Sequence, residues 1–171
     1  MDNNQHHTGD KKPLLANTGE PPISNLEFDP AGDSAELLER GGVLEFPELQ
    51  LRIEPQLSGT PPVTVVRWQG RIANNNSYEL NRKANAVFGN NHHSLIMDLS
   101  GLEYINSSGV AILFSIIFKA REKEVQVVIG GMHPFLSNVF RLMDLPGEMT
   151  VFENVAAAQA ALVNGSVSNP A

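Results

Sequence analysis

The residues best suited to chemistry in this 171-residue chain lie in one short polar segment, Asn106-Ser107-Ser108-Gly109. An apolar run typical of a buried helix, Val110–Phe118, follows directly. A helix N-terminus presents unpaired N–H groups and the positive end of the helix dipole. A phosphoryl group on a serine there would find hydrogen-bond donors and would add about −1.5 to −2 charges. The segment is therefore a candidate for regulatory phosphorylation, and helix capping or turn formation is the purely structural alternative.

The other polar residues form no catalytic or metal-binding pattern. Absence of cysteine excludes disulfides, thiol nucleophiles and cysteine-ligated metal. His133 and Asp144 have no Gly-x-Ser-x-Gly turn near them, and the pairs His6-His7 and His92-His93 lack further ligands at zinc spacing. Gly130-Gly131 lacks the third glycine and the lysine of nucleotide-binding loops, so a nucleotide sensor is only a minor alternative. We expect a protein that is not an enzyme, with no metal and no cofactor.

The elements that must position the serines alternate between strands and helices. Strands are predicted from alternating or β-branched apolar residues, and helices from apolar residues at helical spacing between capping and stop signals. The expected strands are Leu49–Ile53, Val63–Trp68, Ser94–Leu99, Val125–Ile129 and Met149–Phe152, and the expected helices are Tyr78–Phe88, a long helix opened by Ser107 or Ser108, Pro134–Met143 and Val155–Val163. The order β-β-α-β-α-β-α-β-α favours an α/β fold with a mostly parallel central sheet of about five strands and four helices.

The two ends of the chain differ from this region in composition. Residues 1–43 are rich in Pro, Gly, Asn and Asp, and they hold too few large apolar side chains to offset the entropy of ordering. We predict a mostly disordered extension there, in which Asp33–Arg40 has the start and stop signals of a short helix. Residues 44–164 are the predicted folded domain, and 165–171 a C-terminal tail.

Charge and hydropathy exclude two classes of partner. The formal net charge is −7 and the basic residues are scattered, whereas nucleic-acid binding requires clustered Lys and Arg. No apolar run reaches the roughly 18 residues of a membrane-spanning helix, which argues against membrane insertion. The first residues contain no apolar segment of a signal peptide, so we expect a cytoplasmic protein.

Two stretches of this sequence resemble the STAS domain of bacterial anti-sigma factor antagonists. Met97–Val110 is similar to the family signature, in which a strand ending in Asp-Leu-Ser precedes an aromatic–aliphatic pair, Asp-Ser-Ser/Thr-Gly and an apolar helix. Pro134–Leu145 is similar to the third helix of the family. The resemblance extends from about Leu49 to Val163 and implies a single STAS domain.

The resemblance implies a partner-switching regulator in signal transduction and transcription control. The unphosphorylated form would bind an anti-sigma factor or related serine kinase, phosphorylation of Ser107 would weaken that binding, and a PP2C-type phosphatase would restore it. Ser108 is the alternative acceptor, and Asn106 replaces the family's Asp, which removes one negative charge. A STAS scaffold subunit of a transport or signalling complex, without phosphorylation, is the other interpretation. The expected partner-binding residues are Arg71, Ile105, Asn106, Ser107, Ser108 and Gly109.

Overall fold

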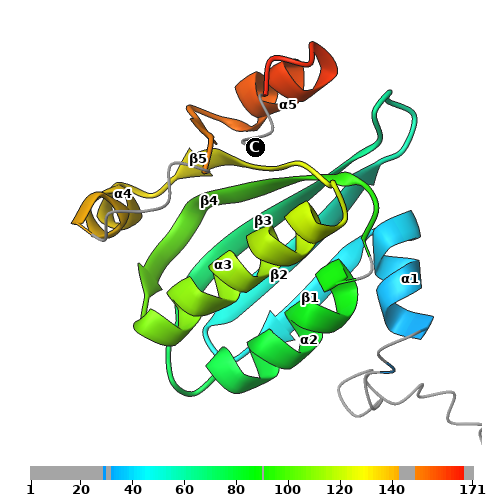
Figure 1. Ribbon diagram of the computed structural model, residues 1–171. Coiled ribbons are helices and arrows are strands. Elements are labelled where there is room, and N and C mark those ends of the chain that lie inside the picture. Colours follow the sequence, from blue (N-terminus) through cyan, green and yellow to red (C-terminus); the bar gives the residue numbers. More distant parts are fainter. Residues whose placement is uncertain (1–28, 30–31, 90, 143–148, 168–171) are drawn as a thin grey trace, which may run out of the picture.

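A computed structural model describes residues 29, 32–89, 91–142 and 149–167 of the chain (Figure 1). Most of the predicted N-terminal extension, with His6-His7, lies outside the described residues, as do Asp144 and the last residues of the tail. The elements in chain order are α1 (Gly32–Arg40), β1 (Gly42–Phe46), β2 (Leu49–Gln56), β3 (Val63–Ile72), α2 (Ser77–Gly89), β4 (Ser94–Ile105), α3 (Ser107–Glu122), β5 (Val127–Met132), α4 (Pro134–Leu142), β6 (Val151–Phe152) and α5 (Val155–Val163).

The strands form one mixed sheet in the order β1-β2-β3-β4-β5-β6. The first three strands are antiparallel neighbours, and β3 to β6 are parallel to one another. The predicted α/β class and the predicted alternation of strands and helices are confirmed. Since parallel neighbours end at the same edge of the sheet, the ends of β3 and β4 lie side by side, with Ile72 opposite Ile105.

The structure adds one strand before the first predicted strand. The strand β1 is the first arm of a hairpin with β2, and Glu48 takes a positive φ of 58° in the turn. The strand β1 has only five residues and ends next to Pro47, so its alternation of apolar and polar residues is too short to be recognised in the sequence. The short helix predicted over Asp33–Arg40 is present as α1, and its Leu38 is buried in the main core. The predicted domain limits themselves stay a prediction.

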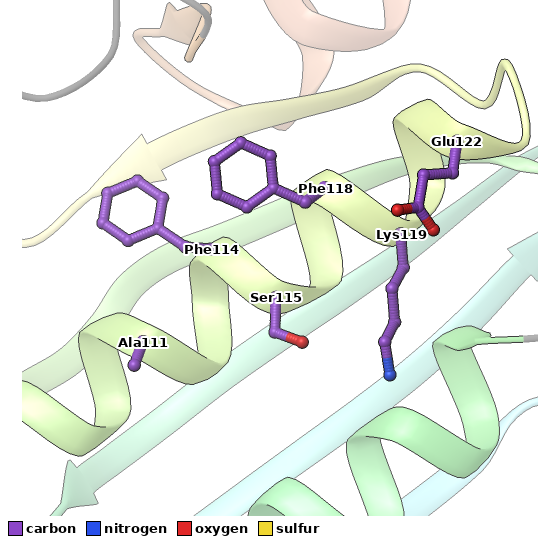
Figure 2. Close-up of a pocket in the computed structure, with 6 residues that line it drawn as sticks. All are labelled: Ala111, Phe114, Ser115, Phe118, Lys119 and Glu122. Atoms are coloured by element: carbon purple, nitrogen blue, oxygen red, sulfur yellow. The ribbon is translucent and has the colours of Figure 1, made fainter.

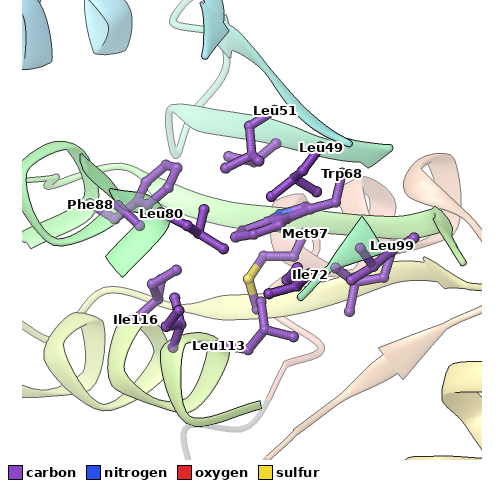
Figure 3. Close-up of a cluster of buried hydrophobic side chains, with 14 of the residues drawn as sticks. Leu49, Leu51, Trp68, Ile72, Leu80, Phe88, Met97, Leu99, Leu113 and Ile116 are labelled. Carbon is purple, nitrogen blue, oxygen red and sulfur yellow. The ribbon is translucent and has the colours of Figure 1, made fainter. Parts of the chain in front are cut away.

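Helices cover both faces of the sheet. Figure 1 shows α2 and α3 side by side on one face, where α2 also contacts α1. The large core lies beneath them, and Trp68 and Met97 from neighbouring strands pack there among side chains of β2, α2 and α3 (Figure 3). A smaller apolar cluster on the opposite face joins Val65 and Ile96 to Ala158 and Leu162 of α5. Within the described residues, no helix has both the length and the apolar character needed to cross a bilayer.

Four strands end later than predicted: β2 reaches Gln56, β3 reaches Ile72, β4 reaches Ile105 and β5 reaches Met132. The strand β4 continues past Leu99 to Ile105, through irregular pairing with β3, whereas we predicted that it ends at Leu99. The strand β5 continues past Ile129, where we predicted its end, and so includes Gly130 and Gly131. A β-carbon on Gly130 would lie 2.9 Å from the Cα of Val155, so this glycine lets α5 approach the sheet. Close packing accounts for Gly130 without a phosphate.

Candidate functional site

The predicted switch segment lies where β4 passes into α3. Ser107, the earlier of the two predicted starts, is the first residue of α3, and Asn106 before it has extended backbone angles (φ −90°, ψ 175°). The Asn106 side chain Oδ1 accepts a hydrogen bond of 2.8 Å from the backbone N–H of Gly109. Asn106 is therefore the N-cap of α3, and Ser108 does not begin the helix. An amide side chain in this extended conformation can reach the N–H three residues ahead, and the Ser108 side chain lies inside the first turn.

The serine side chains are free to react because Asn106 does the capping. Both Ser107 and Ser108 are exposed to solvent. In the described part of the structure, neither hydroxyl has a hydrogen-bond partner. Within the first turn, the cap bond satisfies only the N–H of Gly109, so the N–H groups of both serines remain available to an anion.

A second loop holds Asn106 in place. The Asn106 Nδ2 donates a 2.8 Å hydrogen bond to Oδ1 of Asn74, which lies in the loop between β3 and α2. The backbone N–H of Asn106 donates to the carbonyl of Ile72 at the end of β3. In the same loop, Asn76 is buried and its Nδ2 donates to the carbonyls of Pro47 and Arg71, at 2.6 and 2.8 Å. The loop before α2 and the loop before α3 are therefore joined by side-chain hydrogen bonds.

Gly109 brings α3 close to the sheet. A β-carbon at this position would lie 2.6 Å from Cγ2 of Ile72 and 2.7 Å from Cγ1 of Ile105. Real β-carbons do not approach side-chain carbons so closely, so only glycine lets the first turn of α3 rest on the ends of β3 and β4. Gly109 and Ile105 are both buried. Of the predicted partner-binding residues, these two support the segment from beneath, and a partner could not touch them directly.

Arg71 lies at the same edge of the sheet but on the other face. Successive residues of a strand point to opposite faces, and the buried Ile72 points toward α3. The guanidinium of Arg71 lies over the ring of Tyr104, 5.1 Å from its centre. Tyr104 in turn stacks on Phe135 of α4, with 6.2 Å between the ring centres. The structure therefore separates Arg71 from Ser107 and Ser108 and gives it an aromatic partner, Tyr104, that the sequence pattern did not indicate.

The surface next to the serines is hollowed. A shallow depression of about 400 Å³ lies between the first turns of α2 and α3 and is lined by Ser77, Tyr78, Asn81, Ser108, Ala111 and Ile112. Tyr78 is the first residue of the helix predicted from apolar residues at helical spacing, but its side chain is 83% exposed. It precedes the first buried residue of the helix, Leu80, by two positions, which places it on another face. An exposed aromatic side chain beside the serines is a ready contact for another protein.

A second depression of about 590 Å³ lies along the outer surface of α3. Its lining residues all belong to this helix: Ala111, Phe114, Ser115, Phe118, Lys119 and Glu122 (Figure 2). Figure 2 shows the two phenyl rings on one side of the helix and Ser115 and Lys119 directed toward α2. The Lys119 Nζ lies 2.6 Å from Oδ1 of Asn85 on α2. We expected Phe114 and Phe118 in a buried run, but Phe118 is 47% exposed.

The Asp-Leu-Ser part of the signature forms a separate polar cluster on the face that carries Val65 and Ile96. Asp98 is buried, and its carboxylate accepts hydrogen bonds from the N–H and hydroxyl of Ser100 and from Arg67 Nη1 at 2.6 Å. Glu54 also pairs with Arg67, at 3.1 Å. Partial burial lowers the pKa of the Arg67 guanidinium, but hydrogen bonds and charges of Glu54 and Asp98 outweigh it and raise that pKa. The hydrogen bonds of Asp98 are to Ser100 and Arg67, and Asp98 forms none with Ser107 or Ser108 in the described part of the chain.

The described residues include no cluster of side chains suited to bind a metal ion. No group of three or more His, Cys, Asp or Glu side chains in this part of the chain is placed to hold an ion. His133 precedes α4, where its Nδ1 accepts a hydrogen bond from the N–H of Phe135 at 3.2 Å. This contact is a capping interaction at the start of a helix.

Comparisons with known proteins agree with this geometry. Residues 54–158 match the STAS domain family. An anti-sigma factor antagonist from Mycobacterium paratuberculosis superimposes with a TM-score of 0.58 at 24% identity, covering 71% of this chain and 99% of that one. A variant of RsbS from Moorella thermoacetica gives 0.52 at 16% identity, with 75% and 98% covered.

A larger protein also contains a similar domain. The structure of SLC26A9 matches with a TM-score of 0.50 at 16% identity, covering 78% of this chain but only 26% of that protein. A comparison with curated proteins found no match. At these identities the likeness concerns the fold.

Proposed function

Because the chain belongs to the STAS domain family, we propose that it is a non-enzymatic regulatory protein of the anti-sigma factor antagonist type. It binds an anti-sigma factor or related serine kinase, and phosphorylation of Ser107 controls this binding. The observation that carries the proposal is the exposed first turn of α3, where Asn106 caps the helix and leaves both serine hydroxyls without a partner in the described part of the chain.

The geometry makes Ser107 a good acceptor at little cost to the fold. A phosphate on Ser107 would lie at the positive end of α3, beside the N–H groups that the cap bond leaves available. It would bring about −1.5 to −2 charges to a surface that now carries two neutral hydroxyls. A partner that docks an acidic or apolar surface there would lose affinity, while the domain itself would stay folded. A phosphorylation switch requires this combination of weaker partner binding and an intact fold.

Ser107 and Ser108 differ in their surroundings. Ser108 lines the depression between α2 and α3, beside Tyr78 and Asn81. Ser107 is the first helical residue and directly follows the cap. Ser107 also occupies the family's acceptor position, so it is the proposed site and Ser108 the alternative. The neutral Asn106 leaves the phosphate without a neighbouring carboxylate at the position before it.

The proposed cycle has three components. The unphosphorylated chain binds the kinase and so releases the other client of that kinase. The kinase phosphorylates Ser107, which weakens its binding to the chain. A PP2C-type phosphatase then regenerates the unphosphorylated, binding form. The similarity to an anti-sigma factor antagonist from Mycobacterium paratuberculosis supports this class of partner.

Phosphopeptide mapping of the chain from its native cells tests the modification. We expect phosphate on the tryptic peptide that contains Ser107, and a Ser107→Ala chain should lack it. Phosphate on Ser108 alone would move the site by one residue. A chain that carries no phosphate in this segment under any growth condition would contradict the switch and favour a scaffold role, for which the domain-level likeness to SLC26A9 is the supporting observation.

Affinity capture with substituted chains tests the charge mechanism. Wild-type and Ser107→Ala baits should enrich the same serine kinase, and a Ser107→Asp bait should recover at least about ten-fold less, equivalent to about 1.4 kcal/mol. Ser137→Asp is a matched control, because Ser137 is an exposed serine of α4. Equal recovery with Ser107→Asp and wild-type baits would refute repulsion by charge at this position.

A further inference from the structure

The outer surface of α3 carries a continuous stripe that begins at the proposed phosphorylation site. Positions three and four apart share one face of a helix, and this spacing joins Ser107, Ala111, Phe114, Phe118 and Glu122. Ser107, Ala111, Phe118 and Glu122 are exposed, and Phe114 is half-buried. The middle of the stripe is apolar and lines the depression that Figure 2 shows. We call these five residues the α3 stripe.

The α3 stripe is symmetric about its centre in a way that a second copy of the helix could use. The midpoint between Phe114 and Ser115 is equally far from Ala111 and Phe118, and also equally far from Ser107 and Glu122. If a second α3 lay antiparallel across this midpoint, Phe118 of each copy would face Ala111 of the other. A large side chain opposite a small one is the arrangement that packs without voids. Phe114 of each copy would face the small Ser115.

The ends of the α3 stripe are electrostatically complementary under the same symmetry. At about 1.5 Å per residue, Ser107 and Glu122 each lie about 11 Å from the midpoint. The exposed carboxylate of Glu122 from one copy would therefore meet the first turn of α3 in the other, where N–H groups and the positive dipole end favour an anion. A two-fold axis produces this contact twice.

We propose that the α3 stripe is a self-association surface, on which two copies of this chain pack α3 against α3 in antiparallel orientation. The neighbouring depression shares Ala111 with this surface, so the exposed Tyr78 of α2 widens the contact. One helix face from each copy gives a small interface, so the dimer is weak and concentration-dependent.

Phosphorylation would dissolve this dimer, a consequence that rests on the proposed function of Ser107. A phosphate on Ser107 would replace the favourable anion site with about −1.5 to −2 charges, directly opposite Glu122 of the second copy. Both symmetric contacts would become repulsive at once. The same modification would then control self-association as well as kinase binding.

Sedimentation velocity on the full chain tests the association without any kinase. We expect the weight-average mass to rise from monomer toward dimer between about 10 μM and about 1 mM, the range expected of a small interface. Ala111→Phe should weaken association at least about ten-fold, because two phenyl rings would then oppose each other. Ala160→Phe on α5 is the matched control, since Ala160 is also an exposed helical alanine, and it should associate like wild type.

A charge exchange tests the orientation of the two helices. Ser107→Asp alone should weaken the dimer about ten-fold, and the double variant Ser107→Asp with Glu122→Lys should restore it, because each new aspartate then meets a lysine. Urea denaturation checks that each variant is folded. Failure of the double variant to associate better than Ser107→Asp would overturn the antiparallel arrangement, as would a dimer indifferent to Ala111→Phe.

The outcomes separate this proposal from the proposed function. A chain that stays monomeric at about 1 mM overturns self-association and leaves phosphorylation of Ser107 untouched. If Ala111→Phe abolishes capture of the kinase while the wild-type chain remains monomeric, the α3 stripe belongs to the kinase and the dimer is refuted. A wild-type dimer with no phosphate on Ser107 in native cells would refute the switch alone.

Discussion

Replacing Asn106 by alanine should destabilise the start of α3, because two side-chain hydrogen bonds of Asn106 are lost. The substitution removes the cap bond to the Gly109 N–H, a loss of about 1 kcal/mol for a typical N-cap. It also removes the bond to Asn74, which is exposed and contributes about 0.5 kcal/mol. We therefore expect a decrease of about 1.5 kcal/mol in the free energy of unfolding, measured by urea denaturation with an unchanged m-value.

A second asparagine cap in the same chain is the matched control. Asn154 caps α5 through a 2.9 Å bond from the Ala157 N–H to its Oδ1, and no second side-chain bond of Asn154 is described in the structure. Asn154→Ala should therefore cost about 1 kcal/mol, less than Asn106→Ala. Adding Asn74→Ala to Asn106→Ala should cost little more, because the bond between the two side chains is already lost.

Asn106→Asp completes this test. The carboxylate keeps the cap bond and adds a negative charge at the helix N-terminus, which contributes about 0.3–1 kcal/mol. It also loses the donation to Asn74, which costs about 0.5 kcal/mol, so the free energy of unfolding should change by no more than about 0.5 kcal/mol. Amide exchange at Gly109 should quicken in the alanine variant and stay slow in the aspartate variant. Unfolding curves of Asn106→Ala that overlay the wild type would refute the assigned cap, as would a greater loss for Asn154→Ala.

Three further changes follow from the same contacts. Gly109→Ala should lower the free energy of unfolding by about 1–2 kcal/mol, since the clash of the new β-carbon with Ile72 and Ile105 outweighs the gain in helix propensity. A β-carbon on Gly89 would have no atom within 4 Å, so Gly89→Ala should change the free energy of unfolding by less than about 0.5 kcal/mol. Asp98→Ala should lower the free energy of unfolding by about 1–3 kcal/mol, because a buried carboxylate that accepts hydrogen bonds from two residues is lost. Arg67→Ala should lower it by only about 0–1 kcal/mol, because that side chain is 44% exposed. Urea denaturation that gives the reverse order of the two losses would refute this account. Ser107→Asp should raise the free energy of unfolding by about 0.3–1 kcal/mol at low salt and less at high salt, and a loss of stability at low salt would contradict the favourable helix end.

The neutral Asn106 changes the electrostatics of the segment without changing its shape. Asparagine and aspartate cap helices about equally well, so the first turn of α3 keeps the form that an aspartate would support. The amide also donates to Asn74, which an ionised carboxylate could not do. A phosphate on Ser107 would meet no neighbouring carboxylate at position 106.

The sequence alone determined most of the order of elements and where the candidate site lies. Alternating and β-branched residues predicted five strands of the sheet, and helical spacing predicted four helices. The strand-to-helix transition before Ser107 follows from a buried apolar strand, a polar capping segment and an apolar helix, which are local signals. These features depend on residues close together in the chain, so they can be read without knowing the fold.

Only the tertiary structure decided what each residue of the site contacts. The bond from Asn106 to Asn74 and the close approach of Gly109 to Ile72 join positions that the fold brings together. The same is true of β1, whose pairing with β2 makes a short segment into a strand. Exposure of Tyr78 depends on the packing of helices over the sheet, which a one-dimensional pattern does not contain. The sequence located the serines, and the packing around them determined which atoms face the solvent.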